Sequence, residues 1–515
     1  MSAQASFPDR RRQRFLAVEH MVASGPLALL FVLLGGLALG ILLWYATVNH
    51  VGPSVTAGDT TLVVAIVTGV IAIFGAWYAY GTYFARRAGI DVATALRWDA
   101  PSWAALAISG GGLVLPIAFG GPLRAVAYAL AAFAIAKLLV AARFVPTVRD
   151  VLVTFIVTRI PIIITAEIAA ATIAQRPGTH VIASTNPLLA VWGRWDAVHY
   201  LDIARRGYAG TDMAFFPLYP TLVHFFGAFV GSDLVAGLII SNVALLFGLL
   251  FFYKLIEHQY TRAVAHRAIF YVSIFPTAIF FSAVYTESLF FALTVASFYY
   301  IREHRWIAAG AIGACAALTR SEGVLLVIPL AIEVIAAAQA TGIRKFFTTP
   351  QRLVRVGIGA ALIPLGLATY MAYLWILNGD PLYFSHVQTH WNRHFAPPWV
   401  SVSHAFTVLA TARSPVTIAN ESIEIVFTAL MIGIFIAGLR RMRPSYSAYM
   451  ALAILIPMST SSLMSMPRFA LVLFPMFAML AIWGGRSWVN NAIVAFSLPL
   501  LGLFTVLFAD WYWVA

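Results

Sequence analysis

Two kinds of residue are scarce in this chain of 515 residues. Cysteine occurs once, at Cys315, and charged residues make up only 10% of the sequence. A lone cysteine excludes an internal disulfide and gives no support to a cysteine-based metal cluster; its apolar neighbours predict that it is buried. Soluble domains carry about 25% charged residues, so the low charge content excludes an ordinary soluble protein.

Lysine is almost absent as well. It occurs only at Lys137, Lys254 and Lys345, so arginine supplies most of the formal net charge of +13. In a chain with 61% hydrophobic residues, basic residues usually mark cytoplasmic loops. We therefore expect no nucleic-acid partner. The preference for arginine and alanine favours a bacterial source, and the basic N-terminus precedes an apolar run that we expect to be retained rather than cleaved.

Long apolar runs are abundant. A run of about 20 apolar residues can cross a bilayer as a helix, and this criterion predicts about 15 spans. They lie near residues 26–47, 61–85, 102–120, 122–142, 150–174, 232–253, 268–284, 286–301, 306–320, 322–340, 357–377, 418–439, 445–459, 467–484 and 489–509. The sequence therefore predicts an all-α polytopic membrane protein with a four-helix N-terminal extension, 1–148, and a core, 149–515.

The segment 213–231 decides the expected orientation. It is apolar, but Pro217 and Pro220 interrupt its start. If it lies at the outer interface without spanning, most Lys and Arg residues fall in inner loops, as the positive-inside rule requires. This puts the N-terminus in the cytoplasm and the loop 175–231 on the outer face of a bacterial plasma membrane. The tetrapeptide RWDA at 97–100 and its copy at 194–197 then face opposite compartments, and we expect the first copy to be coincidental.

The richest polar stretch is RWDAVHYLDIARRGY, 194–208. A helix there would place Asp196, His199 and Tyr200 on one face and turn Asp202 away. Asp196 could act as a general base toward an acceptor hydroxyl, or it could cap the helix N-terminus. The residues alone leave both interpretations open.

The next stretch, AFFPLYP at 214–220, combines aromatic residues with paired prolines. Such a stiff surface at headgroup depth could face lipid and cradle a lipid tail, or it could serve only as an interfacial anchor. The residues that we expect to face lipid are Phe215, Phe216, Pro217 and Tyr219.

Other polar residues fall at the predicted outer ends of the spans. Glu287 could position a substrate hydroxyl or pair with an arginine, because a carboxylate at membrane depth is costly without a partner. Arg320 could bind phosphate through its planar fork, or pair with Glu287 or Glu322. The loop 378–400 contributes His390, Trp391, Asn392 and Arg393, and the tetrapeptide MPRF contributes Arg468. No metal-ligand spacing or nucleotide-binding motif is present, so we expect no metal and no cofactor.

Taken together, these segments resemble the PIG-V family, the second mannosyltransferase of glycosylphosphatidylinositol assembly, and its bacterial relatives. The resemblance covers about 150–515 and rests on the order of RWDAVHYLDIARRGY, AFFPLYP, SIFPTAIFFSAVYTESLFFAL, ALTRSEG, HVQTHWNRHF and MPRF. Glu322 departs from it, because a residue such as Asn is expected there. The resemblance implies a GT-C glycosyltransferase fold and a polyprenyl-phosphate sugar donor, expected to carry mannose, on the outer face.

The resemblance also implies roles for the site residues. It favours Asp196 as the general base of an inverting transfer to a hydroxyl of a glycan, glycolipid or protein acceptor, with Arg320 or Arg468, aided by His390, stabilising the leaving phosphate. The expected substrate-binding residues are His199, Tyr200, Asp202, Glu287, Arg320, His390, Trp391, Asn392, Arg393 and Arg468.

Two alternatives stay open. A lipid-linked sugar transporter or flippase would place polar residues midway through its spans, and Lys137, Arg159 and Glu167 fit that description. A catalytically silent scaffold is the other.

Overall fold

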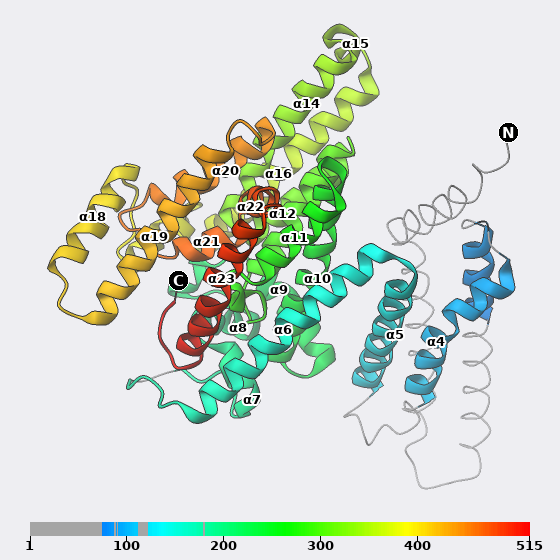
Figure 1. Cartoon of the computed structure of the whole chain (residues 1–515), viewed down its shortest axis with the longest axis horizontal. Helices are drawn as coiled ribbons and strands as arrows, with labels where there is room; N and C mark the ends of the chain where they lie inside the picture. Colours follow the sequence, from blue (N-terminus) through cyan, green and yellow to red (C-terminus); the bar gives the residue numbers. More distant parts are fainter. Residues whose placement is uncertain (1–74, 87–88, 90, 112–121, 179–180, 515) are drawn as a thin grey trace. The chain divides into compact units, whose positions relative to one another are not determined.

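The computed structural model describes residues 75–514, apart from 87–88, 90, 112–121 and 179–180 (Figure 1). Within these residues the secondary structure is helical, except for one isolated β-bridge between Phe395 and Thr460. The predicted span 26–47, most of the span 61–85 and residues 112–120 of the span 102–120 lie outside the described residues. An all-α protein is therefore confirmed for the part of the chain that the structure describes.

The chain divides into two compact units. Of the described residues, those up to Asp150 and Phe229–Gly231 form the first unit, and those of Val151–Ala228 and from Ser232 onward form the second. All of the residues considered for the site below, from Asp196 to Arg468, belong to the second unit.

In the first unit, a partly buried ion pair joins α4 (Val92–Gly111) to α5 (Pro122–Phe144). Lys137 binds both carboxylate oxygens of Asp99, and Trp103 Nε1 donates to the same carboxylate at 2.7 Å. Asp99 is the acid of the first RWDA, so this copy of the tetrapeptide has a structural partner within its own unit. The pair satisfies two charges that would otherwise be costly to bury.

Six described helical segments are long and apolar enough to cross a membrane, or seven if a bent pair is counted as one span. They are α6 (Pro146–Thr172), α10 (Asp233–Gln259), η5 with α14 (Ser321–Leu326 and Val327–Thr341), α16 (Pro350–Asn378), α19 (Pro415–Gly438) and α23 (Ser487–Ala509), and the bent pair is α21 (Met466–Val472) with α22 (Phe474–Trp483). These helices support an integral membrane protein. The predicted count of about 15 spans is not confirmed.

Shorter helices account for much of the difference in the second unit. They are α7 (Pro187–Ala190), α8 (Ala197–Arg206), α9 (Leu218–Val230), α11 (Arg262–Ser273), α12 (Glu287–Arg302), α13 (Trp306–Thr319), α15 (Ile343–Phe347), α17 (Tyr383–His386), α18 (Pro398–Thr411) and α20 (Pro444–Met458). Several coincide with predicted spans but stop after fewer than the roughly 20 residues that a straight span requires. Cys315, in α13, is half-buried rather than fully buried.

One predicted span, 268–284, is not a continuous helix. Helix α11 ends at Ser273, and residues 274–286 form a buried loop with one short 3₁₀ turn, η4 (Ala278–Phe281). Buried backbone carbonyls need donors, and Arg159 on α6 supplies them: it binds the carbonyl oxygens of Ser273 and Ala278, the latter at 2.8 Å. A buried arginine therefore permits an irregular backbone where hydropathy alone predicts a helix.

The bend between α21 and α22 also serves the site. The two helices meet at 73°, and Pro475 stands in the first turn of α22, where its missing N–H has no partner to lose. The N-terminus of α21 is held by Glu424 of α19, whose carboxylate accepts from Ser465 N at 2.8 Å and Met466 N at 2.9 Å. This anchor fixes the first turn of α21, which carries Arg468.

Close backbone packing aligns α13 with α16. A Cβ atom on Gly310 would lie 2.2 Å from the carbonyl oxygen of Gly359, so only glycine allows this approach. Arg320 directly follows the end of α13, and this contact therefore helps to set its position.

Candidate active site

Asp196 stands where the chain changes from an irregular segment to helix α8. The short 3₁₀ turn η2 (Val191–Gly193) precedes an extended Arg194, Trp195 has a positive φ of 59°, and α8 begins at Ala197. Asp196 occupies the N-cap position, but its side chain makes no capping hydrogen bond. Its Oδ2 instead accepts from Arg468 Nη1 at 2.6 Å. Capping therefore does not explain this carboxylate.

Arg468 joins Asp196 to Glu287. Its Nε and Nη2 donate to Glu287 Oε1 at 2.9 and 2.7 Å, and its guanidinium carbon lies 5.0 Å from the ring centres of Phe280 and Tyr285. Glu287 is fully buried at the first position of α12, where the helix dipole favours a negative charge. The guanidinium group thus holds carboxylates from two helices in one orientation.

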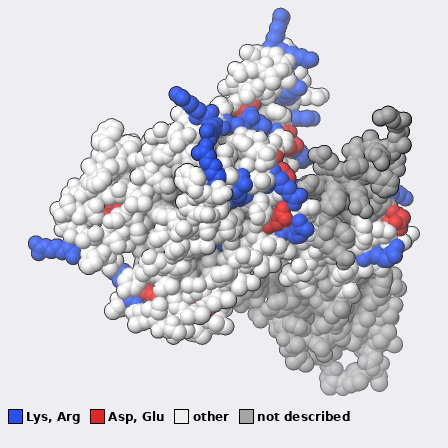
Figure 2. Space-filling model, viewed as in Figure 1, with Lys and Arg blue, Asp and Glu red and all other residues white. Residues whose placement is uncertain are grey.

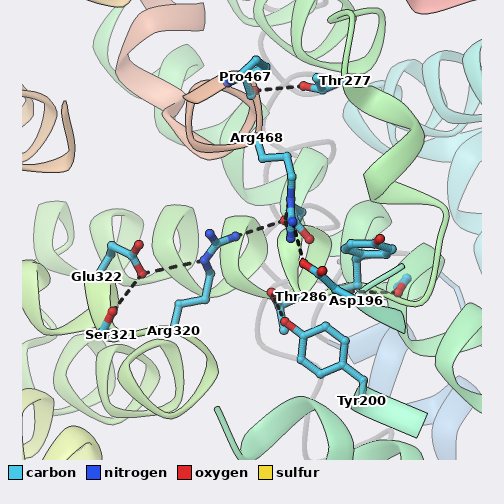
Figure 3. Close-up of polar contacts among 12 residues, drawn as sticks. Asp196, Tyr200, Thr277, Thr286, Arg320, Ser321, Glu322, Pro467 and Arg468 are labelled. Atoms are coloured by element: carbon cyan, nitrogen blue, oxygen red, sulfur yellow. Dashed lines mark hydrogen bonds and ion pairs between the residues drawn. The ribbon is translucent and has the colours of Figure 1, made fainter. Parts of the chain in front are cut away.

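Arg320 extends the arrangement. Its Nη1 donates to Glu287 Oε1 at 3.1 Å, and its Nε lies 3.7 Å from Glu322 Oε2 (Figure 3). Both ion pairs considered for Arg320 are therefore formed. Asp196, Arg468, Glu287, Arg320 and Glu322 make a continuous set of contacts, which we call the charge cluster. Among its carboxylate side chains, Asp196 is the most exposed at 28%, against 15% for Glu322 and 0% for Glu287.

A third arginine, Arg393, lies near the charge cluster. It follows the 3₁₀ turn η6 (Val387–Trp391) and Asn392, whose φ is 54°. Burial lowers the pKa of its guanidinium, while Glu322 and Glu424 act in the opposite direction. In the described structure Arg393 forms no ion pair, and its buried Nε has no hydrogen-bond partner. Arg393 therefore keeps donors that Arg468 has committed to its two carboxylates.

His199 and Tyr200 extend from Asp196 along α8 into an aromatic cluster. His199 Nδ1 lies 2.7 Å from Asp212 Oδ1, and the His199 ring stacks on Phe215 at 4.6 Å and meets Trp391 edge-on at 6.3 Å. Tyr200 is buried, which raises its pKa, and its hydroxyl lies 3.3 Å from Thr286 Oγ1. These contacts hold α8 against the aromatic side of the site.

Three of the predicted substrate-binding residues lie apart from the charge cluster. Asp202 is half-buried, and its carboxylate forms no hydrogen bond or ion pair within the described structure. His390 is exposed, and its ring contacts Trp391 at 5.3 Å. Asn392 is exposed, and its carbonyl oxygen accepts from Ser461 Oγ at 2.6 Å.

The expected lipid-facing residues need correction. Tyr219 is fully buried and its hydroxyl bonds with Ser241 Oγ at 2.8 Å, while Phe216 is 6% exposed and packs on Tyr370 at 4.9 Å. Phe215 and Pro217 are half-buried. The prediction that Phe216 and Tyr219 face lipid is wrong, because helix α16 and the neighbouring helices cover these two side chains.

The sequence analysis missed the C-terminal segment Asp510–Val514. Trp513 lies 5.5 Å from the Arg468 guanidinium and 5.4 Å from the Trp195 ring, and Trp511 lies 4.9 Å from the Arg194 guanidinium. The run DWYWV, directly after the last apolar span, was a signal that could have drawn attention to this segment. Trp511 and Trp513 thus pack against the residues that flank or bind Asp196, the acid of the second RWDA.

Comparisons with known proteins show a similarity to one family. The family model for the mannosyltransferase (PIG-V) matches residues 136–374, a range that contains Asp196, Glu287 and Arg320. No curated protein matches the sequence.

Solved structures of an oligosaccharyltransferase from Archaeoglobus fulgidus are also similar. The complex with Zn and sulfate gives a TM-score of 0.33 at 14% identity over 68% of this chain, and the apo form gives 0.32 at 12% over 68%. This chain covers 53% and 55% of the two solved chains, or about half their length.

The match of residues 136–374 confirms the resemblance read from the motifs for that part of the chain, which is similar to the mannosyltransferase (PIG-V) family. Together with the apolar helices described above, it supports a membrane glycosyltransferase.

Proposed function

We propose that this protein transfers a sugar, mannose by its family, from a polyprenyl-phosphate donor to an acceptor hydroxyl at the outer membrane face. The fold that we infer for it is GT-C. One observation carries the proposal: the buried charge cluster contains one carboxylate, Asp196, that is fixed by Arg468 and still partly accessible. A general base needs both properties, because it must be oriented and must also reach the proton that it removes.

Asp196 suits this role better than Glu287. Glu287 Oε1 accepts three hydrogen bonds from Arg320 and Arg468, and the residue is completely buried. Asp196 accepts one hydrogen bond from Arg468 on Oδ2, which leaves lone pairs on Oδ1 for an incoming hydroxyl. We therefore assign Asp196 as the base and Glu287 as the residue that positions the arginines.

The proposed reaction is a single displacement. The acceptor oxygen forms a bond to the anomeric carbon while its proton passes to Asp196. On the opposite side of the sugar ring, the bond between the anomeric carbon and the phosphate oxygen breaks, and its electron pair stays on the leaving polyprenyl phosphate. Attack from the opposite side inverts the anomeric configuration, so a β-linked donor gives an α-linked product.

Arg393 and Arg320 are the arginines best suited to the leaving phosphate. Arg468 directs Nε, Nη1 and Nη2 at the two carboxylates, which leaves it little capacity for phosphate. Arg393 forms no ion pair in the described structure, whereas Arg320 donates one hydrogen bond, from Nη1 to Glu287 Oε1 at 3.1 Å, and its Nε lies 3.7 Å from Glu322 Oε2. Guanidinium groups aimed at a developing phosphate charge stabilise the transition state electrostatically.

The distribution of basic residues supports an outer location. Helix α14 begins beside the segment that carries Arg320 and ends near Arg344 and Lys345 of α15, so the site and these cations lie at opposite ends of it. Figure 2 shows that Lys and Arg side chains gather over the end of the second unit that carries α15. Because basic residues favour the cytoplasmic side, the site would face outward.

The residues behind the transporter alternative have structural partners. Lys137 pairs with Asp99, Arg159 binds the carbonyls of the buried loop, and Glu167 accepts from Trp192 Nε1 at 2.8 Å. Each of the three therefore has a structural partner within its own unit, which accounts for its presence without a transport path. A glycosyltransferase therefore remains the better-supported function.

The test uses the full chain in nanodiscs with radiolabelled polyprenyl-phosphate mannose and membrane glycolipids as acceptors. Asp196→Asn should lower kcat by about 10²- to 10⁴-fold, the usual contribution of a general base, with little change in donor binding. Glu303→Gln, at an exposed carboxylate outside the charge cluster, is the control and should retain activity. Equal loss in both variants, or full activity in Asp196→Asn, would refute the assignment; labelled donor crossing a liposome membrane without a new glycosidic bond would favour the transporter.

A further inference from the structure

The second copy of RWDA contains a buried arginine that the proposed reaction does not use. Arg194 is 3% exposed, and its Nε and Nη1 atoms have no hydrogen-bond partner among the described residues. In the first copy, by contrast, Arg97 is exposed and its Nε donates to Ala93 O of the same helix at 3.3 Å. A buried charge is costly unless other charges compensate it, so the surroundings of Arg194 show what it does.

Two carboxylates from different elements act on Arg194. Asp510 directly follows α23 and is 2% exposed, and both of its carboxylate oxygens lack a hydrogen-bond partner among the described residues. Glu167 lies on α6, where it accepts from Trp192 Nε1. Burial lowers the pKa of the Arg194 guanidinium to about 10, while Asp510 and Glu167 act in the opposite direction. The arginine therefore keeps its positive charge at neutral pH, and the two acids compensate that charge.

Tryptophan rings hold the same two segments together. The Arg194 guanidinium lies 4.9 Å from the ring centre of Trp511, and the Trp195 ring lies 5.8 Å from Trp511 and 5.4 Å from Trp513. Trp195 and Trp511 both have a positive φ, of 59° and 64°. A bulky residue rarely adopts this backbone conformation, which persists only where surrounding contacts hold it. The segment before Asp196 and the C-terminal segment therefore fix each other's turns.

The turn at Trp195 sets the position of Asp196. Asp196 directly follows Trp195, and its side chain makes no capping hydrogen bond to α8. Arg468 holds its carboxylate, whereas the contacts of Arg194 and Trp195 hold the backbone that carries it. A displacement of about 1 Å in a reacting group can cost about 10²-fold in rate, so the position of this turn affects the reaction.

We propose that Arg194 is a positioning residue for Asp196, and that the charges of Asp510 and Glu167 hold Arg194 in place. The C-terminal segment is then part of the catalytic unit, although none of these three residues touches a substrate. The inference rests on the proposed function and adds residues that act on the reaction through the proposed base.

The test is a double-mutant cycle of Arg194 and Asp510 in the full chain in nanodiscs, with the labelled donor and the glycolipid acceptors described above. Arg194→Gln and Asp510→Asn each remove one charge and leave the other uncompensated. Each should lower kcat about tenfold, with little change in KM for the donor. The double variant removes both charges and should be no less active than Arg194→Gln alone, because the effects of coupled residues do not add.

Arg194→Lys separates the role of charge from the role of shape. A lysine keeps the positive charge, and Arg194 makes no forked hydrogen bond that lysine would lose, so kcat should stay within about threefold of that of the unaltered protein. Equal losses in Arg194→Lys and Arg194→Gln would contradict a role of the charge. Arg486→Gln, at an exposed position before the first residue of α23, is the control and should leave kcat unchanged.

Three further results would overturn the positioning role while leaving the transferase intact. They are an unchanged kcat in both single variants, losses that multiply in the double variant, and a rise in KM for the donor as large as the fall in kcat, which would indicate a general loss of structure. If the unaltered protein transfers no sugar, the proposed function fails instead. The pairing of Arg194 with Asp510 is then decided by the same cycle measured as thermal unfolding.

Discussion

At the scale of single residues, Arg468 is the centre of the site. It donates to Asp196 and Glu287, which come from different helices, and it packs against aromatic rings. Removing one partner of a buried ion pair is costly, by about 3–5 kcal/mol, because the remaining charge has no compensation. A substitution at any one of the five residues of the charge cluster is therefore expected to disturb the positions and charges of the other four.

We predict that Arg468→Lys abolishes most activity although it keeps the charge. A lysine ammonium group cannot reproduce the planar fork that holds both carboxylates at once, so Asp196 loses its orientation. We expect kcat to fall by about 10²-fold, near the low end for loss of a preorganised donor, while KM for the donor changes little. Arg206→Lys, on the exposed end of α8, serves as the control; activity close to that of the unaltered protein in Arg468→Lys would contradict this role.

At the scale of elements, irregular segments rather than long helices build the site. The buried loop 274–286 donates from Val284 N to Trp192 O at 3.1 Å and from Tyr285 Oη to Arg194 O at 3.0 Å, and Thr277 Oγ1 donates to Pro467 O at 3.0 Å. These bonds join the segment before Asp196 to the helix that carries Arg468. The loop thus acts as the frame between the two ends of the charge cluster.

The C-terminal segment makes a testable contribution of its own. The contact between Trp513 and Arg468 is expected to stabilise the arginine by about 0.5–2 kcal/mol. Trp513→Ala should therefore lower kcat by roughly 2- to 30-fold without a matching change in KM, and Trp513→Phe should recover part of the loss. Trp488→Ala, at an exposed position of α23, should leave kcat unchanged. An effect confined to protein yield or thermal stability would instead mean that Trp513 only supports folding.

At the scale of the whole molecule, the basic residues of α15 and the charge cluster lie at opposite ends of helix α14 in the second unit. Glu333 of α14 gathers Arg302, Arg443 and Ser445 at 2.9, 3.1 and 2.6 Å. These contacts join α12, α14 and α20. The charge cluster lies where α14 begins, at its other end.

This separation predicts the sidedness of chemical labelling. In a Cys315→Ser background, Phe395→Cys should react with a membrane-impermeant maleimide added to intact cells, because Phe395 is 88% exposed on the loop side. Ile343→Cys, 60% exposed in α15, should react only after the membrane is opened. The reverse labelling pattern would place the charge cluster on the cytoplasmic side and would contradict the proposed polyprenyl-phosphate donor.

Local sequence patterns were sufficient to predict the membrane helices, the family resemblance and an expected orientation. Apolar runs specify membrane helices without reference to the rest of the chain, because the backbone must satisfy its hydrogen bonds within each segment when water is absent. The order of the motifs was sufficient to indicate a resemblance to the mannosyltransferase (PIG-V) family, which the match of residues 136–374 confirms for that range. The charge of α15 and the loops around it was sufficient to suggest an orientation.

Only the tertiary structure decided what the polar residues do. Asp196 and Arg468 are 272 positions apart, and no local pattern can state that they share a hydrogen bond. Hydropathy predicted a helical span at 268–284, because a hydropathy profile contains no information about the hydrogen bonds that Arg159 donates to the irregular backbone there. It also predicted that Tyr219 faces lipid, because it contains no information about the helices that cover this side chain. Ion pairing and burial depend on contacts between distant segments, so they are properties of the folded chain.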